Sequence, residues 1–381
     1  MKEKAELVII GGGVSGLGTA YQLAKRGFTD IIVIERDYFG SGATGRCGGG
    51  IRQQFSEEYN IILARESVRM FERMSEELGQ DIGFRQGGYL ILAHTDEEAE
   101  DLRKNVNLQN SLDVPSRYME PEGALDIVPE LNIDGLSAAA YCPTDGVAQP
   151  FLMIKAYVDK LKEMGVELHD HTEVLDIEVE NGEIRKVITD KGEIKTNMVL
   201  NAAGAWSRDI AKMVGVELPN KPYRHEIMAT EHMKPWLKPM VISFHNGVYF
   251  SQSHDGEIVG GIGDPDEPSS YNIKSSLEFL ERFTSVVVRY IPIMRKVKVM
   301  RQWAGLYDVT PDARPILGPV EELPGFIQAH GYSGHGFMIH PMVTKLLAEY
   351  IIDGKTSIDI EPLNLRRYTS GETIQEKNVV G

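Results

Sequence analysis

The stretch "ELVIIGGGVSGLGTAYQLAKRG", residues 6–27, decides the fold. Four apolar residues precede the glycines, which is typical of a buried strand that ends in a tight turn. Val14, Leu17, Tyr21 and Ala24 then recur at helical spacing, which predicts a helix. A strand, a glycine-rich turn and a helix in this order are typical of the phosphate-binding part of a dinucleotide site.

The three glycines of this turn have separate physical roles. Gly11 permits the tight turn, Gly13 lets the backbone approach a pyrophosphate, and Gly16 allows close packing of helix and strand. The N-terminus of the helix is expected to stabilise the negative charge of the pyrophosphate. The segment "IIVIE", residues 31–35, predicts a second parallel strand, and Glu35 at its end is placed to accept hydrogen bonds from a ribose. The alternative is a strand–helix–strand unit with incidental glycines and no bound phosphate.

Composition and charge narrow the class of protein. A chain of 381 residues suggests two domains, and its 42% hydrophobic and 25% charged residues are ordinary for a globular protein. The net charge of −16 argues against nucleic acid or an anionic membrane as a partner. Cys47 and Cys142 form no metal-binding motif, so no metal site is expected. We find no signal peptide and no membrane-length apolar run, and we expect a cytoplasmic protein.

Local patterns predict several further elements. Helices are expected over residues 57–78, 95–112, 150–165, 275–290 and 341–353. A strand is expected at 88–93, and Asn181-Gly182 and Lys191-Gly192 are typical hairpin turns. Residues 217–300 contain strand-like runs and a helix around 275–290, a pattern that is typical of an antiparallel sheet domain with helices. The polar tail is expected to be mobile or at a contact.

Three further motifs follow the first turn in a fixed order. They are "GSGATGRCGGGIRQQ" at 40–54, "LNAAGAWS" at 200–207 and "HGYSGHGFM" at 330–338. Together with the first turn and Glu35, they resemble the FAD-dependent amine oxidase family, which includes D-amino acid oxidase, glycine oxidase and sarcosine oxidase. Within the family, the chain looks most like the β subunit of multi-subunit sarcosine oxidase and dye-linked L-proline dehydrogenase.

The resemblance implies an α/β fold with an α+β second domain: a discontinuous Rossmann-like FAD domain plus a substrate domain built on a mixed or antiparallel sheet. We assign residues 1–80, 141–215 and 301–365 to the FAD domain, 81–140 and 216–300 to the substrate domain, and 366–381 to a polar tail. The residues expected to bind FAD are Gly11, Gly13, Val14, Ser15, Gly16, Glu35, Arg36, Ser41, Thr44, Arg46, Gly48, Gly49, Gly50, Val174, Ala203, Gly204, Trp206, Gly305, Gly331, Gly334, His335 and Gly336.

The chain departs from the family pattern at three places. Gly305 stands where monomeric sarcosine oxidases carry a flavin-bonding cysteine, so noncovalent FAD is expected. Gln149 and Pro150 stand where multi-subunit sarcosine oxidases attach FMN to a histidine, so any FMN is expected to be noncovalent and to lie at a subunit interface. Residues 256–261 contain no lysine where monomeric sarcosine oxidases use one to activate oxygen, which favours a dehydrogenase over an oxidase.

The chemistry that the resemblance implies is hydride transfer from a carbon next to nitrogen onto the flavin, which leaves an imine. Arg52 is the candidate cation for a substrate carboxylate, and His225 or His335 can accept a hydrogen bond from the amine and keep it neutral for hydride loss. Tyr249 is a candidate hydrogen-bond donor. Where relatives carry a carboxylate-binding lysine or arginine, this chain has Met338 and Tyr307.

Three functions remain in competition. The preferred one is oxidation of a secondary-amine amino acid, L-proline to 1-pyrroline-5-carboxylate, by the catalytic β subunit of a complex that passes electrons to an α-type subunit. The second is a sarcosine or glycine oxidase that releases hydrogen peroxide. The third is a structural subunit that holds a flavin while catalysis occurs elsewhere.

Overall fold

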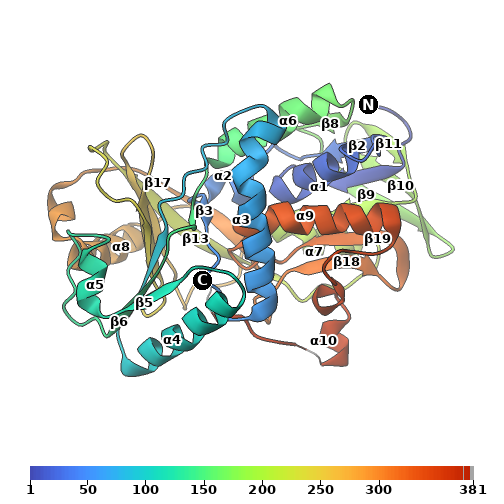
Figure 1. The fold of residues 1–381 in the computed structure, drawn as a ribbon. Coiled ribbons are helices and arrows are strands. Elements are labelled where there is room, and N and C mark those ends of the chain that lie inside the picture. Colours follow the sequence, from blue (N-terminus) through green and yellow to red (C-terminus); the bar gives the residue numbers. More distant parts are fainter. Residues whose placement is uncertain (372, 378–381) are drawn as a thin grey trace.

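The computed structural model describes residues 1–371 and 373–377, and two sheets organise it (Figure 1). The first is a six-stranded sheet in the order β18-β19-β12-β1-β2-β8. Its strands are β1 (Leu7–Ile10), β2 (Ile31–Ile34), β8 (Glu167–His169), β12 (Val199–Asn201), β18 (Ile316–Val320) and β19 (Leu323–His330). The pairs are parallel except for β18 with β19. The expected discontinuous Rossmann-like sheet is confirmed.

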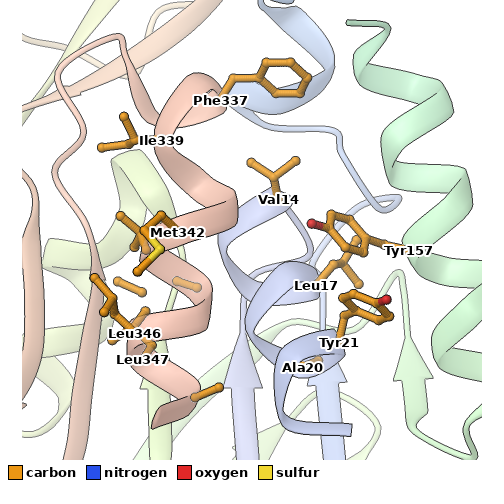
Figure 2. Close-up of a cluster of buried hydrophobic side chains, with 14 of the residues drawn as sticks. Val14, Leu17, Ala20, Tyr21, Tyr157, Phe337, Ile339, Met342, Leu346 and Leu347 are labelled. Atoms are coloured by element: carbon orange, nitrogen blue, oxygen red, sulfur yellow. The ribbon is translucent and has the colours of Figure 1, made fainter. Parts of the chain in front are cut away.

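Both faces of this sheet are covered, which explains why its central strand is apolar throughout. Leu7 and Ile9 of β1 face a cluster formed with α1 (Val14–Ala24), α3 (Glu58–Leu78), α6 (Pro150–Glu163) and α9 (Gly336–Asp353). Figure 2 shows α1 between α6 and α9, with Tyr157 of α6 beside Leu17 and Tyr21.

The opposite face packs against a small three-stranded sheet and a short helix. Val8 and Ile10 of β1 belong to a second apolar cluster, which includes Ile177 and Val187. The small sheet is antiparallel and consists of β9 (Val174–Glu180), β10 (Glu183–Thr189) and β11 (Gly192–Lys195), and the helix is α7 (Ser207–Met213). Both predicted hairpins are therefore present: the first turns at Asn181-Gly182 as predicted, and the second turns at Asp190-Lys191, one residue earlier than predicted, because Gly192 already pairs with Thr189.

The second large sheet has eight strands in the order β17-β13-β16-β15-β14-β4-β6-β5. They are β4 (Tyr89–Ala93), β5 (Arg117–Met119), β6 (Ala138–Cys142), β13 (Lys221–Thr230), β14 (Met240–Ser243), β15 (Val248–Gln252), β16 (Ile258–Ile262) and β17 (Val299–Val309). Only β14 and β4 pair in parallel, so this is the expected mixed sheet. The domain boundary drawn at residue 301 falls inside β17.

Helices and short elements complete the described chain. The helices of the second domain are α4 (Asp96–Ser111), α5 (Pro121–Leu125) and α8 (Leu277–Tyr290). Elsewhere lie α2 (Ala43–Arg46), α10 (Arg367–Ser370), the paired strands β3 (Gly50–Ile51) and β7 (Gly146–Val147), and 3-10 turns at Gly204–Trp206, Pro292–Lys296 and Glu361–Leu363. Among the described residues, no helix combines the length and the apolar character needed to cross a bilayer.

Helix α9 begins at Gly336, five residues before the predicted start at 341. Pro341 predicted a helix start because it has no N–H to donate to the carbonyl four residues earlier. That carbonyl belongs to Phe337, and it lies 2.7 Å from Nδ1 of His340. The side chain of His340 thus takes the place of the missing backbone donor, which lets the helix run through Pro341 and start at the glycine-rich loop.

The segment after α10 packs back onto the molecule as far as the structure describes it. Glu376 is fully buried against the start of α3, where its carboxylate accepts hydrogen bonds from Ser56 and Asn60. In α10, Arg367 forms a buried ion pair with Asp312 at 2.8 Å. Residues 372 and 378–381 of the predicted tail lie outside the described residues.

Candidate active site

The first glycine-rich turn joins β1 to α1 with very little free space. Gly11 has a positive φ of 117°, and a Cβ there would lie 2.2 Å from the carbonyl oxygen of Ala202. A Cβ on Gly16 would lie 2.0 Å from the carbonyl oxygen of Gly11. The N-cap residue of α1, Gly13, has no side chain to cap the helix, and Thr44 Oγ1 accepts a hydrogen bond from the N–H of Val14 in the first turn. The N-terminus of α1 therefore remains suited to a phosphate group.

Glu35 anchors the end of β2 against this turn. One carboxylate oxygen accepts a hydrogen bond from the N–H of Gly12 at 2.8 Å, and the other accepts one from Asp37 at 2.9 Å. Nearby, the guanidinium of Arg36 lies 4.5 Å from the centre of the Trp206 ring. Val174 is buried at the start of β9 in the cluster beneath this region.

The second glycine-rich loop is fixed to its surroundings by side chains. Thr44 Oγ1 accepts a hydrogen bond from Val14 N–H at 3.2 Å, which ties the loop to α1. Arg46 donates to the carbonyls of Ser41 at 2.9 Å and Ala304 at 3.0 Å, which ties the loop to β17. The loop therefore bridges the two large sheets at the position where a cofactor would pass between them.

A cavity of about 810 Å³, partly open to solvent, lies where the two domains meet. The four predicted catalytic candidates Arg52, His225, Tyr249 and His335 all line it. Several predicted flavin contacts line it as well, namely Arg46, Gly48, Gly49, Gly50, Gly305 and Gly334. The glycine-rich loops and the candidate substrate residues thus share one site, while His245 lies elsewhere, paired with Glu98.

Three aromatic rings form a stack on one wall of this cavity. The His225 ring lies 4.4 Å from Tyr307 and 5.6 Å from Tyr249, centroid to centroid, and is nearly parallel to both. Burial lowers the pKa of His225 to about 4, so its imidazole is neutral at pH 7. Its Nε2 has no hydrogen-bond partner in the described part of the chain. Nε2 is thus a buried polar atom whose hydrogen-bonding capacity is not used by the described residues.

Gly261, the last residue of the segment 256–261, packs closely against two rings of the cavity wall. A Cβ on Gly261 would lie 2.9 Å from Tyr249 Oη and 3.1 Å from His225 Nε2. Any side chain at this position would displace one of the two rings. Gly261 therefore belongs to the packing that holds His225 and Tyr249 in place.

Arg52 is a deeply buried cation, with only 3% of its surface exposed. Its guanidinium lies 4.2 Å from the ring centre of Phe55 and 5.4 Å from that of Phe244. It also donates a hydrogen bond to the carbonyl of Gln54. Burial lowers the pKa of Arg52, and the neighbouring acidic groups, Glu376 among them, act against that shift.

His335 is the residue that precedes α9 and, like Arg52, lies against the ring of Phe55. Its ring meets the Phe55 ring edge to face at 5.4 Å. Burial lowers the pKa of His335 to about 4; the charge of Glu376 acts against this shift, and that of Arg52 adds to it. Both candidate imidazoles are therefore neutral at pH 7, and Arg52 carries the positive charge of this wall.

The remaining lining residues were not singled out by sequence motifs. They include Tyr89 from β4, Met240 and Ile242 from β14, and Leu306 from β17. Cys47 also lines the cavity, and burial raises the pKa of its thiol to about 11, so it is protonated at pH 7. Met240 and Ile242 are alternate residues of β14, and such alternation is also what an ordinary sheet core shows, whereas three consecutive residues of β17, 305–307, line the cavity.

The residues present fit a flavin dinucleotide. At Gly11 and Gly16 any Cβ would collide with a backbone carbonyl, so only glycine permits this tight turn, and Glu35 accepts a hydrogen bond from the N–H of Gly12 within it. Gly334, in the third loop, lines the cavity together with the second loop. The arrangement offers backbone N–H groups and a helix N-terminus to a pyrophosphate, and a wide cavity to a ring system.

Comparison with known proteins agrees with this geometry. The family described as FAD dependent oxidoreductase matches residues 6–350. Sarcosine oxidase subunit beta from Arthrobacter sp. is 30% identical, over 98% of this chain and 94% of that protein. Rat mitochondrial dimethylglycine dehydrogenase is 27% identical over 98% of this chain, which spans 46% of that longer protein.

Solved structures show the same fold. L-proline dehydrogenase from P. horikoshii superposes with a TM-score of 0.94 and 41% identity, over 98% of this chain and 100% of that chain. Glycine oxidase from Geobacillus kaustophilus superposes with a TM-score of 0.89 and 26% identity, over 96% and 99% of the two chains. The chain therefore belongs to the FAD-dependent oxidoreductase family of D-amino acid oxidase-type proteins, and FAD is its cofactor.

Proposed function

We propose that this protein is a dehydrogenase of a secondary-amine amino acid, with L-proline, oxidised to 1-pyrroline-5-carboxylate, as its substrate. One observation carries the proposal: a buried cation, Arg52, and a neutral imidazole, His225, line the same cavity. An amino acid presents a carboxylate for the first and an amine for the second. The 41% identity to an L-proline dehydrogenase supports L-proline in particular.

Each residue has a role that follows from its chemistry. Arg52 holds the substrate carboxylate through charge-assisted hydrogen bonds, which are strong in a dry site. His225 accepts the amine proton through Nε2, so that the nitrogen lone pair is free when the adjacent C–H bond breaks. The substrate loses a hydride from carbon and a proton from nitrogen, and a C=N bond forms. FAD, when bound, supplies the hydride acceptor.

The apolar residues of the cavity give a reason for selecting a cyclic side chain. Met240 and Ile242 are adjacent inward-facing residues of β14, and Tyr89 pairs with Met240 across the sheet. The three methylene groups of a pyrrolidine ring gain from burial against such side chains, at about 0.8 kcal/mol per methylene. Sarcosine and glycine offer less apolar surface to this wall.

Electrons are proposed to leave through a partner subunit rather than to molecular oxygen. The cavity has no lysine at residues 256–261, where Gly261 packs against His225 and Tyr249. The sequence is also similar to a protein described as a β subunit of sarcosine oxidase. We infer an α-type partner and, at the interface with it, a noncovalent FMN.

Anaerobic titration of the purified yellow protein tests the proposal. L-proline, sarcosine, glycine and D-alanine are added in turn while the visible flavin band is followed. We expect bleaching by L-proline at the lowest concentration. Bleaching by sarcosine or glycine instead would identify an oxidase-type amine site, and no bleaching by any of them would leave a flavin-holding subunit.

A pair of variants tests the role of Arg52 in the same assay. Arg52→Lys keeps the charge without the planar fork, and Arg52→Met removes the charge at similar volume. We expect the concentration of L-proline needed for half bleaching to rise by about tenfold or more in Arg52→Met, in line with loss of a hydrogen bond to a charged group. Wild-type behaviour of Arg52→Met would exclude Arg52 as the carboxylate ligand.

A further inference from the structure

The buried carboxylate of Asp145 does not line the cavity, but it contacts the two residues that follow Arg52. Asp145, in the turn between β6 and β7, is 0% exposed and has no ion-pair partner within 4 Å among the described residues. Its carboxylate is instead bonded to neutral donors. Oδ1 accepts hydrogen bonds from the backbone N–H of Gln53 at 2.9 Å and from Gln53 Nε2 at 3.0 Å, and Oδ2 accepts one from Gln54 Nε2 at 3.0 Å.

These bonds connect Asp145 to Arg52 through the chain itself. Gln53 and Gln54 directly follow Arg52, and the carbonyl of Gln54 accepts the hydrogen bond from the Arg52 guanidinium. Gln54 Nε2 also donates to the carbonyl of Tyr89 at 3.1 Å, so the link reaches the strand that lines the cavity. Asp145 therefore fixes the two residues that orient the guanidinium.

All three groups that meet the carboxylate oxygens are donors, and such a set favours the ionised form. A carboxylate accepts at both oxygens, whereas a carboxylic acid carries a proton on one of them and offers fewer acceptor sites. Burial raises the pKa of Asp145 to about 6, and the bonds from Gln54 and Gln53 and the charge of Arg52 act against that rise. Ionised Asp145 in turn favours the charged form of Arg52.

We propose that Asp145 is a positioning residue for Arg52: its carboxylate holds the Gln53–Gln54 segment so that the guanidinium faces the cavity, and it thereby sets the affinity of the cavity for a carboxylate ligand. The inference rests on the proposed role of Arg52 and deepens it. It does not depend on which amino acid is the substrate.

The probe is 2-furoate, a carboxylate on a flat ring that has no amine to oxidise. Its binding to the FAD-loaded protein is measured by the change that it causes in the visible flavin spectrum. The neutral analogue 2-furamide, which has the same ring, serves as the comparison ligand. We expect Asp145→Asn to raise the Kd of 2-furoate about tenfold, the effect of one hydrogen bond to a charged group, and to leave that of 2-furamide unchanged.

A matched control removes a carboxylate from the surface. Asp101 lies on α4, is half exposed and pairs only loosely with Lys104, 3.3 Å away. We expect Asp101→Asn to bind both probes as the wild type does. A general loss of packing in Asp145→Asn would weaken both probes together, and this distinguishes a merely structural role from a positioning role.

The pH dependence gives a second readout. The ionisable groups that face Asp145 are Arg52, Tyr89, Tyr141 and Cys142; burial raises the pKa of the two tyrosines and of the thiol, so among these only Arg52 is charged with Asp145 near neutrality. The wild-type Kd for 2-furoate is expected to rise as the pH falls through about 6, where Asp145 takes up a proton. Asp145→Asn should lack this inflection.

The outcomes separate the two proposals. If Arg52→Met loses affinity for 2-furoate and Asp145→Asn does not, the positioning role of Asp145 is wrong and the role of Arg52 stands. If wild type and Arg52→Met bind 2-furoate equally, both roles are wrong. Should Asp145→Asn fail to retain FAD, Gln54→Met removes the bond to Oδ2, together with the bond of the same amide to the Tyr89 carbonyl, and leaves the Gln53 bonds to Oδ1 in place. An unchanged Kd in that variant would overturn the inference.

Discussion

The rings of His225 and Tyr307 lie face to face, with centroids 4.4 Å apart and planes inclined by 7°. The two residues come from neighbouring strands, and the residue paired directly with His225 is Gly305, which has no side chain. Tyr307 is a diagonal neighbour of His225 across the two strands, and its ring reaches the imidazole, while the Arg46 side chain packs over Gly305. The stack thus fixes the plane of His225 and the direction of its ring nitrogens.

Replacing His225 by phenylalanine keeps the ring contact with Tyr307 and removes the proton acceptor. We expect His225→Phe to retain FAD and to reduce it about 100-fold to 10,000-fold more slowly with substrate, the usual contribution of a general base. Anaerobic stopped-flow spectroscopy of the flavin band measures the rate. His245→Phe, at the exposed histidine paired with Glu98, should reduce FAD at the wild-type rate. Full speed in His225→Phe would assign the proton to another group.

Two glycines with positive φ allow a matched test of the third loop. Gly334 has a φ of 90°, and a Cβ there would lie 2.5 Å from Cε2 of Tyr307, whereas Gly354 has a φ of 68° and open space around it. Both alanine variants should lose about 1–3 kcal/mol of stability from backbone strain. Only Gly334→Ala should also slow flavin reduction, by about 100-fold, because it displaces the ring that supports His225. Equal rates in the two variants would contradict this link.

Two adjacent arginines differ in what their removal should cost. Arg367 is 2% exposed and pairs with buried Asp312, while the ion pairs of Arg366 with Glu321 and Glu361 are about half exposed. We expect Arg367→Met to lower the free energy of unfolding by about 3–5 kcal/mol, because it leaves a buried carboxylate unpaired. Arg366→Met should lower it by less than about 1 kcal/mol. Urea unfolding of the two variants measures the difference, and similar midpoints would argue against a buried pair.

Stability should fall on the acid side of neutrality. Burial lowers the pKa of His225, His335 and His340 to about 4 from 6.5, so below pH 6.5 the unfolded chain binds protons that the folded chain does not. Asp145 acts in the opposite direction: its pKa is raised from 3.8 to about 6, so its contribution favours the folded state at low pH and is lost as the pH rises through 6. The combined effect of the three histidines on the free energy of unfolding is larger than the opposite effect of the single carboxyl group, so acid destabilises the fold.

The melting temperature at a series of pH values checks this balance. We expect it to fall steadily between pH 6.5 and pH 4 in the wild type, with a smaller fall in His340→Gln, which keeps a polar side chain that does not titrate. His340 lies in the core between Tyr157 and Phe337 rather than in the cavity, so this variant should leave flavin reduction unchanged. A flat profile in the wild type would exclude these histidines as the origin of acid sensitivity.

Positions of the site where the backbone conformation or a close contact requires glycine could be predicted from the sequence. Gly11 and Gly16 mark positions where any Cβ would collide with a carbonyl, and such a constraint leaves glycine in a recognisable spacing. Arg52 and His335 could be named as candidates because they lie within the second and third glycine-rich motifs, 40–54 and 330–338. The spacing of apolar residues also predicted helices and strands, because each kind of element buries residues at a fixed period.

The walls of the cavity were not visible, for a physical reason. Tyr89 and Ile242 face the cavity from strands in which every residue is buried, so nothing in the alternation distinguishes a ligand-facing side from a core-facing side. Asp145 stands before a glycine and has the appearance of a turn residue, although it is fully buried. Pro341 misplaced a helix start because the compensating donor is a histidine side chain that only the folded chain brings to Phe337.

The strand order of the six-stranded sheet also constrains how the protein can be made. β1 pairs with β12 on one side, and β12 pairs in turn with β19, whose residues are synthesised more than 300 positions after β1. The third glycine-rich loop comes later still, at Gly331–Gly336. A nascent chain on the ribosome therefore holds the first half of a cofactor site long before it holds the second. FAD can therefore bind only late in biosynthesis. Because non-local strand pairing is slow and a bound ligand stabilises the folded state, the concentration of free FAD at that stage should influence the yield of folded protein.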